Sequence, residues 1–354
     1  MYLVHGLTRS YFTRKMTGYL DYTNRPWRLV PMSTEPVHHP KAAAAGWNGA
    51  IPVVDTPSGI PMWDSTSMIE HLEQAPDRPT DRSVLPDDPT LRFLAYLLDD
   101  LSDEWHYRPA VGSRWCYPDN TVTAGWQLAE ELSVPITAPG ALVRDMVVAN
   151  MTGSLGRIGI DPAHMDAWMA EVVTPWFRAL ETHLGDGYLL GGRPSLADFA
   201  VFGANAAHYV GDPYCRALVD QEAPAAVAHT NRLRVPTSQS FGEWAQSPAD
   251  TLVNVVAEAG RHYLPWVAEA TQKGAATVEI ADGVSVEISS SPFLNWARGV
   301  LLARYIALRC DALDAALEQA GVLRYFADYL DQATVVPDWS SPSQPSDNRP
   351  YAIR

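Results

Sequence analysis

The residues best suited to bind a ligand lie in the stretch IPVVDTPSGIPMWDSTSMIEHL, from Ile51 to Leu72. Pro52 opens a short apolar strand, where it cannot donate to a sheet ladder, and an X-Pro bond adopts the cis form at low cost. A cis bond there would leave the backbone of Ile51 free to pair with a ligand. Asp64-Ser65 begins a helix, whose free N–H groups and dipole favour a carboxylate. The pattern predicts a small peptide ligand with an extended backbone and a free carboxylate.

This stretch resembles the glutathione-binding half of the thioredoxin-like domain of glutathione S-transferases. The family pattern is Val/Ile-Pro, two strands, and Glu/Asp-Ser opening a helix of the form S-x-x-I-x-x-Y-L. Ile51-Pro52, Asp64-Ser65 and residues 69–72 match it, with His71 where tyrosine is usual. The resemblance implies that glutathione binds with its γ-glutamyl end at Asp64-Ser65 and its cysteinyl backbone at Ile51 or Val53.

A second match to the family lies far downstream, in GYLLGGRPSLADFAVFG. It is similar to the buried helix of the family's all-helical domain, which a capping box opens. Here the box is Ser195 and Asp198, each bonding the other's backbone amide, and the apolar side chains beside it are Leu189, Leu190 and Phe199. Two such motifs in the right order predict an α/β thioredoxin-like domain followed by an all-α domain.

The resemblance locates the chemistry in the loop HGLTRSYFTRKM after the first strand. A thiolate at the start of the first helix is stabilised by the helix dipole, and in this family it belongs to glutathione, to which the protein donates a hydroxyl hydrogen bond. Alignment with serine-type members places Ser10 at the activating position. Tyr11 and Thr13 remain alternatives, since one residue of slippage exchanges them, and all three could simply cap a helix. Arg14-Lys15 is expected to be a solvated basic pair.

No cysteine stands at position 10 or 13, which disfavours a mechanism through a mixed disulfide with the protein. Many family members carry a lysine two residues before the cis-proline, where it meets the glycine carboxylate of glutathione. Here that position is Ala50, and His38, His39 or Lys41 could replace it. The ten histidines and three cysteines have no metal-ligand spacing, so no metal site is predicted.

A cluster of aromatic and basic residues follows in DEWHYRPAVGSRWCY. Aromatic side chains with a few polar groups suit a pocket for a flat, apolar electrophile. The sequence contains twelve tryptophans, however, and most of them must belong to the core. The candidates for binding the second substrate are Trp105, Tyr107, Arg114 and Trp115.

Composition limits the class of partner. The 354 residues carry a net charge of −15 without a basic run, which argues against nucleic acid and anionic membranes as partners. The first residues resemble a strand rather than a signal peptide, and no apolar run reaches the roughly 18 residues of a membrane span. A cytoplasmic protein is expected.

The chain is expected to comprise two domains and an extension. The extension should contain a helix over residues 244–271, a β-hairpin over 277–288 that turns at Asp282-Gly283, and a helix over 293–320. The expected boundaries are 1–75 for the thioredoxin-like domain, 76–89 for a linker, 90–235 for the all-helical domain, 236–333 for the extension and 334–354 for a tail.

Two functions remain open. The first is a glutathione-dependent transferase, in which Ser10 lowers the pKa of the thiol and the thiolate attacks an electrophilic, apolar or aromatic second substrate. The second is a non-catalytic protein of the same fold that binds a ligand or a protein. The match at Asp64-Ser65 favours the first, and the missing lysine and long extension favour the second. The family resemblance also implies a homodimer.

Overall fold

A four-stranded mixed sheet forms the N-terminal part of the protein. The computed structural model describes the chain except for residues 34, 48, 236–240 and 335–354, so the expected tail lies almost wholly outside the described residues. The strand order is β2-β1-β3-β4, with β1 parallel to β2 and antiparallel to β3, and β3 antiparallel to β4. The strands are β1 (Tyr2–Gly6), β2 (Trp27–Pro31), β3 (Val53–Asp55) and β4 (Pro61–Met62).

Three helices accompany this sheet, as expected for a thioredoxin-like domain. They are α1 (Tyr11–Tyr22), α2 (Pro40–Ala44) and α3 (Ser65–Glu73). Alternate residues of β1 face opposite sides of the sheet. Val4 is buried on one side, while His5 on the other contacts His39 at the start of α2. Helices α1 and α3 pack together, and α1 also packs along α10, so it joins the sheet to the helical part.

The helical part begins with one long, locally irregular helix. Helix α4 (Pro89–Leu101) continues through a π-helical turn, Ser102–His106, into α5 (Tyr107–Cys116). Such turns are frequent at functional sites. The helices that follow are α6 (Pro118–Ile136), α7 (Gly140–Ser154), α8 (Met165–Trp168), α9 (Thr174–Leu184), α10 (Leu196–Ala204), α11 (Pro213–Glu222) and α12 (Pro224–Arg234).

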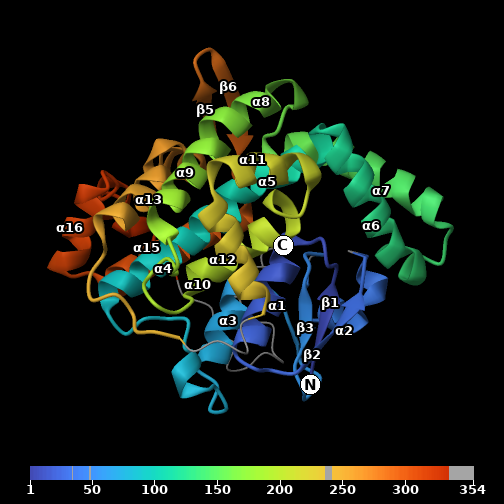
Figure 1. Cartoon of the computed structure of the whole chain (residues 1–354), viewed down its shortest axis with the longest axis horizontal. Coiled ribbons are helices and arrows are strands. Elements are labelled where there is room, and N and C mark those ends of the chain that lie inside the picture. Colours follow the sequence, from blue (N-terminus) through green and yellow to red (C-terminus); the bar gives the residue numbers. More distant parts are fainter. Residues whose placement is uncertain (34, 48, 236–240, 335–354) are drawn as a thin grey trace.

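Helix α10 is the buried helix that the sequence predicts, and its capping box is confirmed. The carboxylate of Asp198 accepts from the backbone N–H of Ser195 at 2.8 Å and from that of Leu189 at 2.9 Å, and it lies 2.8 Å from Nε2 of His229. All of these atoms are buried in the centre of the helical part (Figure 1). The capping box therefore fixes α10, against which the N-terminal part packs.

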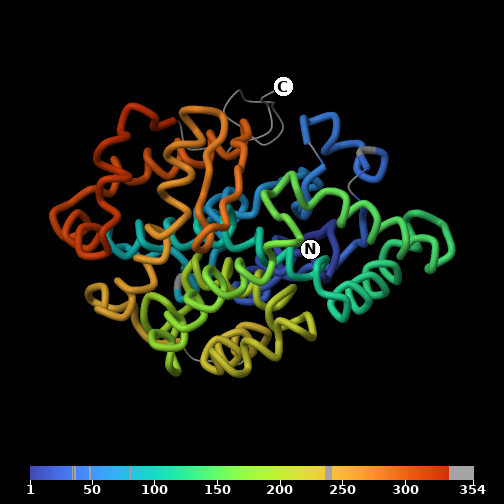
Figure 2. The backbone as a smooth tube through the Cα atoms, turned by 90° about the horizontal axis from the view of Figure 1, so that it is seen from above, coloured from blue at the N-terminus to red at the C-terminus, as the bar shows by residue number. Residues whose placement is uncertain are grey.

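Helices α6 and α7 form a hairpin that projects from the body of the protein (Figures 1 and 2). Its base is tied to the loop after β1, where the backbone N–H of Thr8 donates to Glu131 at 2.8 Å. Among the described residues, no single helix is long and apolar enough to cross a membrane. The pair Pro118–Ile136 and Gly140–Ile158 meets that test only when taken together, across a bend of 112°.

The extension contains the helix, hairpin and helices that the sequence predicts, with two of the helices divided. Strands β5 (Ala275–Ala281) and β6 (Val284–Ser289) turn at Asp282-Gly283, and Gly283 has φ +73°. The helices are α13 (Asp250–Arg261), α14 (Tyr263–Lys273), α15 (Pro292–Leu308), α16 (Asp311–Gln319) and α17 (Arg324–Ala327).

The two long helices predicted for the extension, over 244–271 and 293–320, were therefore wrong. The first divides at His262 because Pro265 has no N–H and its ring clashes with the carbonyl of Arg261, four residues earlier. The second divides at Arg309, where the backbone is extended. Asp314 then folds α16 back onto α15, because it accepts from Tyr305 at 2.6 Å and from Arg309 at 2.9 Å.

Candidate functional site

A cavity lies where α1, α3, α4 and α15 meet the start of β3. Ile51 and Pro52, which are joined by a cis peptide bond, line it together with Asp64 and Ser65. The cavity encloses about 760 Å³ of empty space, part of it open to solvent. The structure thus confirms the cis bond and brings these two halves of the predicted ligand site to one place, whereas Val53 is buried in the sheet.

Asp64 occupies an unusual backbone conformation at the start of α3. Its φ is +68°, a region that non-glycine residues rarely adopt and that clusters at functional sites. Its Oδ1 accepts from the backbone N–H of Ser67 at 2.9 Å and so caps the helix. Burial raises the pKa of Asp64, although hydrogen bonds from Ser67 and the charge of Lys15 oppose the shift. The capped helix start therefore presents a carboxyl group and backbone amides to the cavity.

The structure separates the three hydroxyl candidates of the first loop. Ser10 is the N-cap of α1, is partly buried, and accepts from the backbone N–H of Thr13 at 3.4 Å. Its own O–H has no acceptor among the described residues. Thr13 is buried against Gly6. Burial, with Asp103 and Asp99 adding to it, raises the pKa of Tyr11 well above its usual value. The cavity lining includes Phe12 instead of these three side chains.

Lys15 lies behind the cavity wall and is completely buried, not solvated as the sequence predicts. Its Nζ lies 2.6 Å from Oδ1 of Asp99 and 2.6 Å from Oδ2 of Asp103, and it donates to Oγ1 of Thr66 at 2.9 Å. Burial would lower the pKa of Lys15, but the two carboxylates outweigh it and raise the pKa above its usual value. The ammonium therefore remains charged and joins α1 to α3 and α4.

One wall of the cavity is acidic. Asp99 and Asp100 end α4, and Asp103 and Glu104 belong to the π-helical turn, so the local winding brings four carboxyl groups to one side. Burial raises the pKa of Asp100 to about 6, and it raises the pKa of Glu104 well above its usual value with the help of the neighbouring carboxylates. The pKa of Asp103 is also raised, because burial and the charge of Asp99 outweigh the attraction of Lys15.

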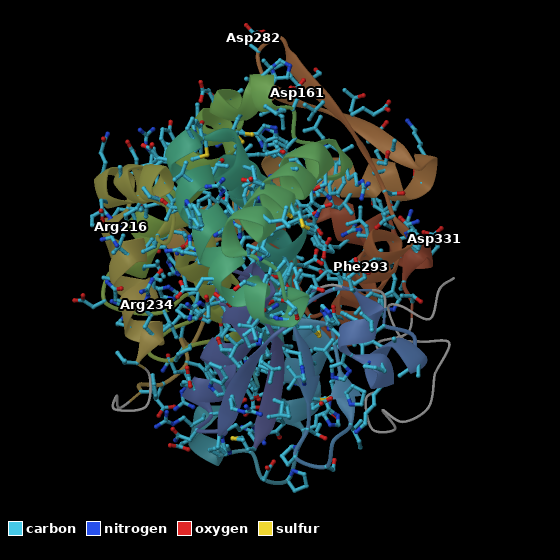
Figure 3. All side chains as sticks on the ribbon, turned by 90° about the vertical axis from the view of Figure 1, so that its right-hand side faces the viewer. Asp161, Arg216, Arg234, Asp282, Phe293 and Asp331 are labelled. Carbon is cyan, nitrogen blue, oxygen red and sulfur yellow. The ribbon has the colours of Figure 1, made fainter. Side chains whose placement is uncertain are left out.

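The opposite wall comes from the extension and was not predicted from the sequence. Helix α15 places side chains along one face of the cavity, and Figure 3 shows Phe293 at its start, above the N-terminal sheet. Arg304 fixes the helix to the N-terminal part by donating to Glu70 at 2.5 Å, and its guanidinium lies 4.1 Å from the ring centre of Tyr96. The helical spacing of the lining residues is the signal that could have indicated this wall: Phe293, Trp296, Ala297, Val300 and Arg304.

The residues proposed to replace the missing lysine lie outside the cavity lining. His39 caps α2 by accepting from the backbone N–H of Ala42 at 3.2 Å, and its Nε2 lies 3.2 Å from Asp55. His5 approaches the other oxygen of Asp55 at 3.2 Å. Burial would raise the pKa of Asp55, but the two imidazoles outweigh it and lower the pKa below its usual value. Lys41 is exposed on α2.

The three side chains His5, His39 and Asp55 lie close enough together to be considered as metal ligands. Because Nδ1 of His39 accepts a backbone hydrogen bond, its proton lies on Nε2, the nitrogen that faces Asp55. A protonated nitrogen cannot bind a metal. The arrangement therefore fits an aspartate that anchors α2 to the sheet, a contact that the sequence did not indicate.

The predicted pocket for the second substrate has a different location in the structure. Trp105 is buried among Trp168, Tyr263 and Trp266, and Arg114 donates to Asp212 at 2.9 Å in the interior. Tyr107 packs beside Phe12 but is outside the cavity lining, as is the buried Trp115. These four side chains belong to the interior of the helical part, next to the cavity rather than around it.

Two family models match the chain. The glutathione S-transferase N-terminal domain matches residues 4–80, and the glutathione S-transferase C-terminal domain matches residues 162–228. Both fall on the parts of the fold that the two sequence motifs mark. The chain belongs to the glutathione S-transferase superfamily. The α6–α7 hairpin and the whole extension lie outside both matches.

Solved structures of similar fold include several bacterial glutathione S-transferases, but none of the curated proteins compared matches the chain. The enzyme of Methylobacterium radiotolerans, in complex with glutathione sulfonate, is 18% identical with a TM-score of 0.36, over 70% of this chain and 99% of that chain. The one from Methylobacillus flagellatus, with GSH bound, has values of 16%, 0.36, 65% and 93%. Beta-etherase LigF from Sphingobium has values of 16%, 0.45, 66% and 94%. These likenesses are too distant to indicate an activity.

The buried ammonium of Lys15 generates a prediction about stability. Replacing Lys15 with methionine leaves two buried carboxylates without their cation, so the free energy of unfolding at pH 7 should fall by about 3–5 kcal/mol. Without the cation the carboxyl pKa values rise, and the folded variant binds more protons than the unfolded chain. Its stability should therefore fall further as the pH rises from 5 to 8. Denaturant titrations at several pH values measure both effects.

Lys273→Met is the matched control, because Lys273 pairs with Glu269 at 2.8 Å on the exposed surface of α14. An exposed pair of this kind contributes about 0–1 kcal/mol. Equal losses of stability in the two variants would show that the Lys15 ammonium is not the buried tie described above.

Proposed function

We propose that this protein is a cytoplasmic glutathione-dependent transferase that acts on a small electrophilic second substrate. The observation that carries the proposal is the convergence of Ile51-Pro52 and Asp64-Ser65 on one cavity. The backbone at Ile51 would pair with the cysteinyl part of glutathione. The carboxyl of Asp64 suits the ammonium of the γ-glutamyl end, and the free amides at the start of α3 suit its carboxylate.

Ser10 is the group that we propose for activating the thiol. Its Oγ caps α1 and its proton remains available for donation. A hydroxyl that donates to a thiolate stabilises the charged form and lowers the thiol pKa. Tyr11 and Thr13 are less suited, because both hydroxyls are buried in the interior. The reaction class is the attack of glutathione's sulfur on an electrophilic carbon.

A second candidate function, ligand binding without catalysis, is favoured by the acidic wall. Negative charge near a thiol raises its pKa and so opposes activation. Arg304 is the one basic residue among those that line the cavity, and it is already bound to Glu70. Turnover of a broad panel of electrophiles would favour the transferase, and glutathione binding without any turnover would favour the second function.

The glutathione site is tested at Asp64. Asp64→Ala removes the proposed partner of the ligand's ammonium, so glutathione affinity should fall by about 1.5–3 kcal/mol, roughly 10- to 150-fold. Isothermal titration calorimetry measures this loss. Asp88→Ala is the control, because Asp88 caps α4 with the same 2.9 Å bond but lies outside the cavity lining. If both variants bind like the wild type, the ligand is held elsewhere.

The activating hydroxyl is tested at Ser10. Ser10→Ala should lower the rate with a reactive aryl halide at pH 7 by about tenfold for each unit of increase in the thiol pKa, with little change in glutathione affinity. The deficit should shrink at high pH, where the thiol ionises unaided. Ser10→Thr keeps both the hydroxyl and the cap and should retain the activity. A loss in Tyr11→Phe instead would assign the role to that phenol.

A two-fold homodimer, which the family resemblance implies, is part of the proposal. Support comes from the α6–α7 hairpin, which exposes Val134 at 77% and also Val122, Trp126, Leu142 and Met146. Exposed apolar surface of this kind is typical of interaction sites. Light scattering at micromolar concentration should give twice the monomer mass, and Leu142→Asp should reduce it. Ile306→Asp, on the exposed side of α15, is the control. A monomer mass for the wild type would contradict the proposal.

A further inference from the structure

The acidic wall of the cavity exceeds what glutathione requires. Glutathione carries one ammonium and two carboxylates, and Asp64 is sufficient for its ammonium. Four further carboxyl groups face the same cavity from α4 and the π-helical turn. A second anion-rich group would be repelled by them. The wall therefore needs an explanation beyond glutathione itself.

Two of the carboxyl groups on this wall lack complete partners. Asp103 is only 7% exposed, and although its Oδ2 binds Lys15, its Oδ1 has no hydrogen-bond partner among the described residues. The carboxylate of Glu104, partly open to the cavity, has no hydrogen bond or ion pair within the described part of the chain. A buried carboxylate oxygen without a donor is costly. Asp99 and Asp100 are satisfied by Lys15 and by the hydroxyl of Tyr263.

The remaining lining favours an apolar body attached to a cation. Phe12 approaches from α1, and Phe293 and Trp296 approach from α15 with ring centres 5.7 Å apart. Faces of aromatic rings attract ammonium groups and also pack against apolar groups. No basic side chain of the described lining is available to an anion, because Arg304 is bound to Glu70.

We propose that this cavity binds an organic amine in its cationic form, with the ammonium between Asp103 and Glu104 and the apolar part against Phe12, Phe293 and Trp296. Only the identification of that amine as the second substrate rests on the proposed function, since amine binding itself requires no glutathione. The substrate class would then be electrophiles that carry an amine.

The raised pKa values of Asp100, Asp103 and Glu104 agree with this inference. Each protonated carboxyl would lose its proton when a cation binds, so binding should release protons and strengthen as the pH rises towards neutrality. The other charged or titratable groups that face this cluster are Lys15 and Tyr11 of α1, Asp64 beside α3, Asp99 of α4, Arg108 of α5, Tyr263 of α14, and Arg298 and Arg304 of α15.

The test compares 2-phenylethylamine with 2-phenylethanol, its neutral counterpart, on the full chain without glutathione. Calorimetry should show that the amine binds about tenfold more tightly than the alcohol, as expected for a charged hydrogen bond. The heat should also vary with the ionisation enthalpy of the buffer, because protons are released. Equal affinity for the two probes, or binding of neither, would overturn the inference.

Variants locate the site of the ammonium. Glu104→Gln should weaken the amine about tenfold and leave the alcohol unchanged, and it should fold normally because Glu104 has no partner to lose. Asp103→Asn should act in the same way, with its thermal midpoint monitored because Asp103 also binds Lys15. Glu318→Gln, on the exposed side of α16, should have no effect. Wild-type amine affinity in Glu104→Gln would place the amine elsewhere and overturn the assignment.

Glutathione titrations of the same samples keep the two proposals separate. Preferential amine binding without glutathione turnover would contradict the transferase and leave the amine site standing. Turnover of neutral electrophiles without preference for the amine would contradict the amine site and leave the transferase standing.

Discussion

The buried ammonium of Lys15 is the contact on which the geometry of the site depends. It comes from α1 of the thioredoxin-like part, and its partners are Asp99 and Asp103 of the helical part and Thr66 of α3. A buried charge without partners is strongly unfavourable, so these groups must stay together for either part to remain folded. The relative position of cis-Pro52, the start of α3 and the acidic wall is thereby fixed.

The fold was largely predictable because its decisive signals are local. A proline that opens a strand, an Asp-Ser helix start and a capping box are each set by neighbouring residues, and all three occur as expected. The β-hairpin of the extension follows from Asp-Gly and alternation in the same way. Boundaries failed only where one side chain changed the backbone, as Pro265 does between α13 and α14.

The candidate site was predictable only in half. Asp64 and Pro52 belong to one continuous motif, but the acidic wall and the wall of α15 depend on contacts between residues far apart in the chain. Lys15 looks like an ordinary surface lysine in the sequence, since nothing near it indicates that Asp99 and Asp103 will enclose it. Aromatic residues such as Trp105 indicate burial without indicating whether a core or a pocket surrounds them.

The contribution of α15 to the cavity has a consequence for how this protein can diverge from its relatives. The wall formed by Phe293, Trp296 and Val300 is encoded more than 200 residues away from the helix start at Asp64. Substitutions along that one face of α15 alter the shape offered to a partner molecule while the segment from Ile51 to Ser65 remains untouched. Selectivity and co-substrate recognition can therefore evolve as separate traits within a single binding space.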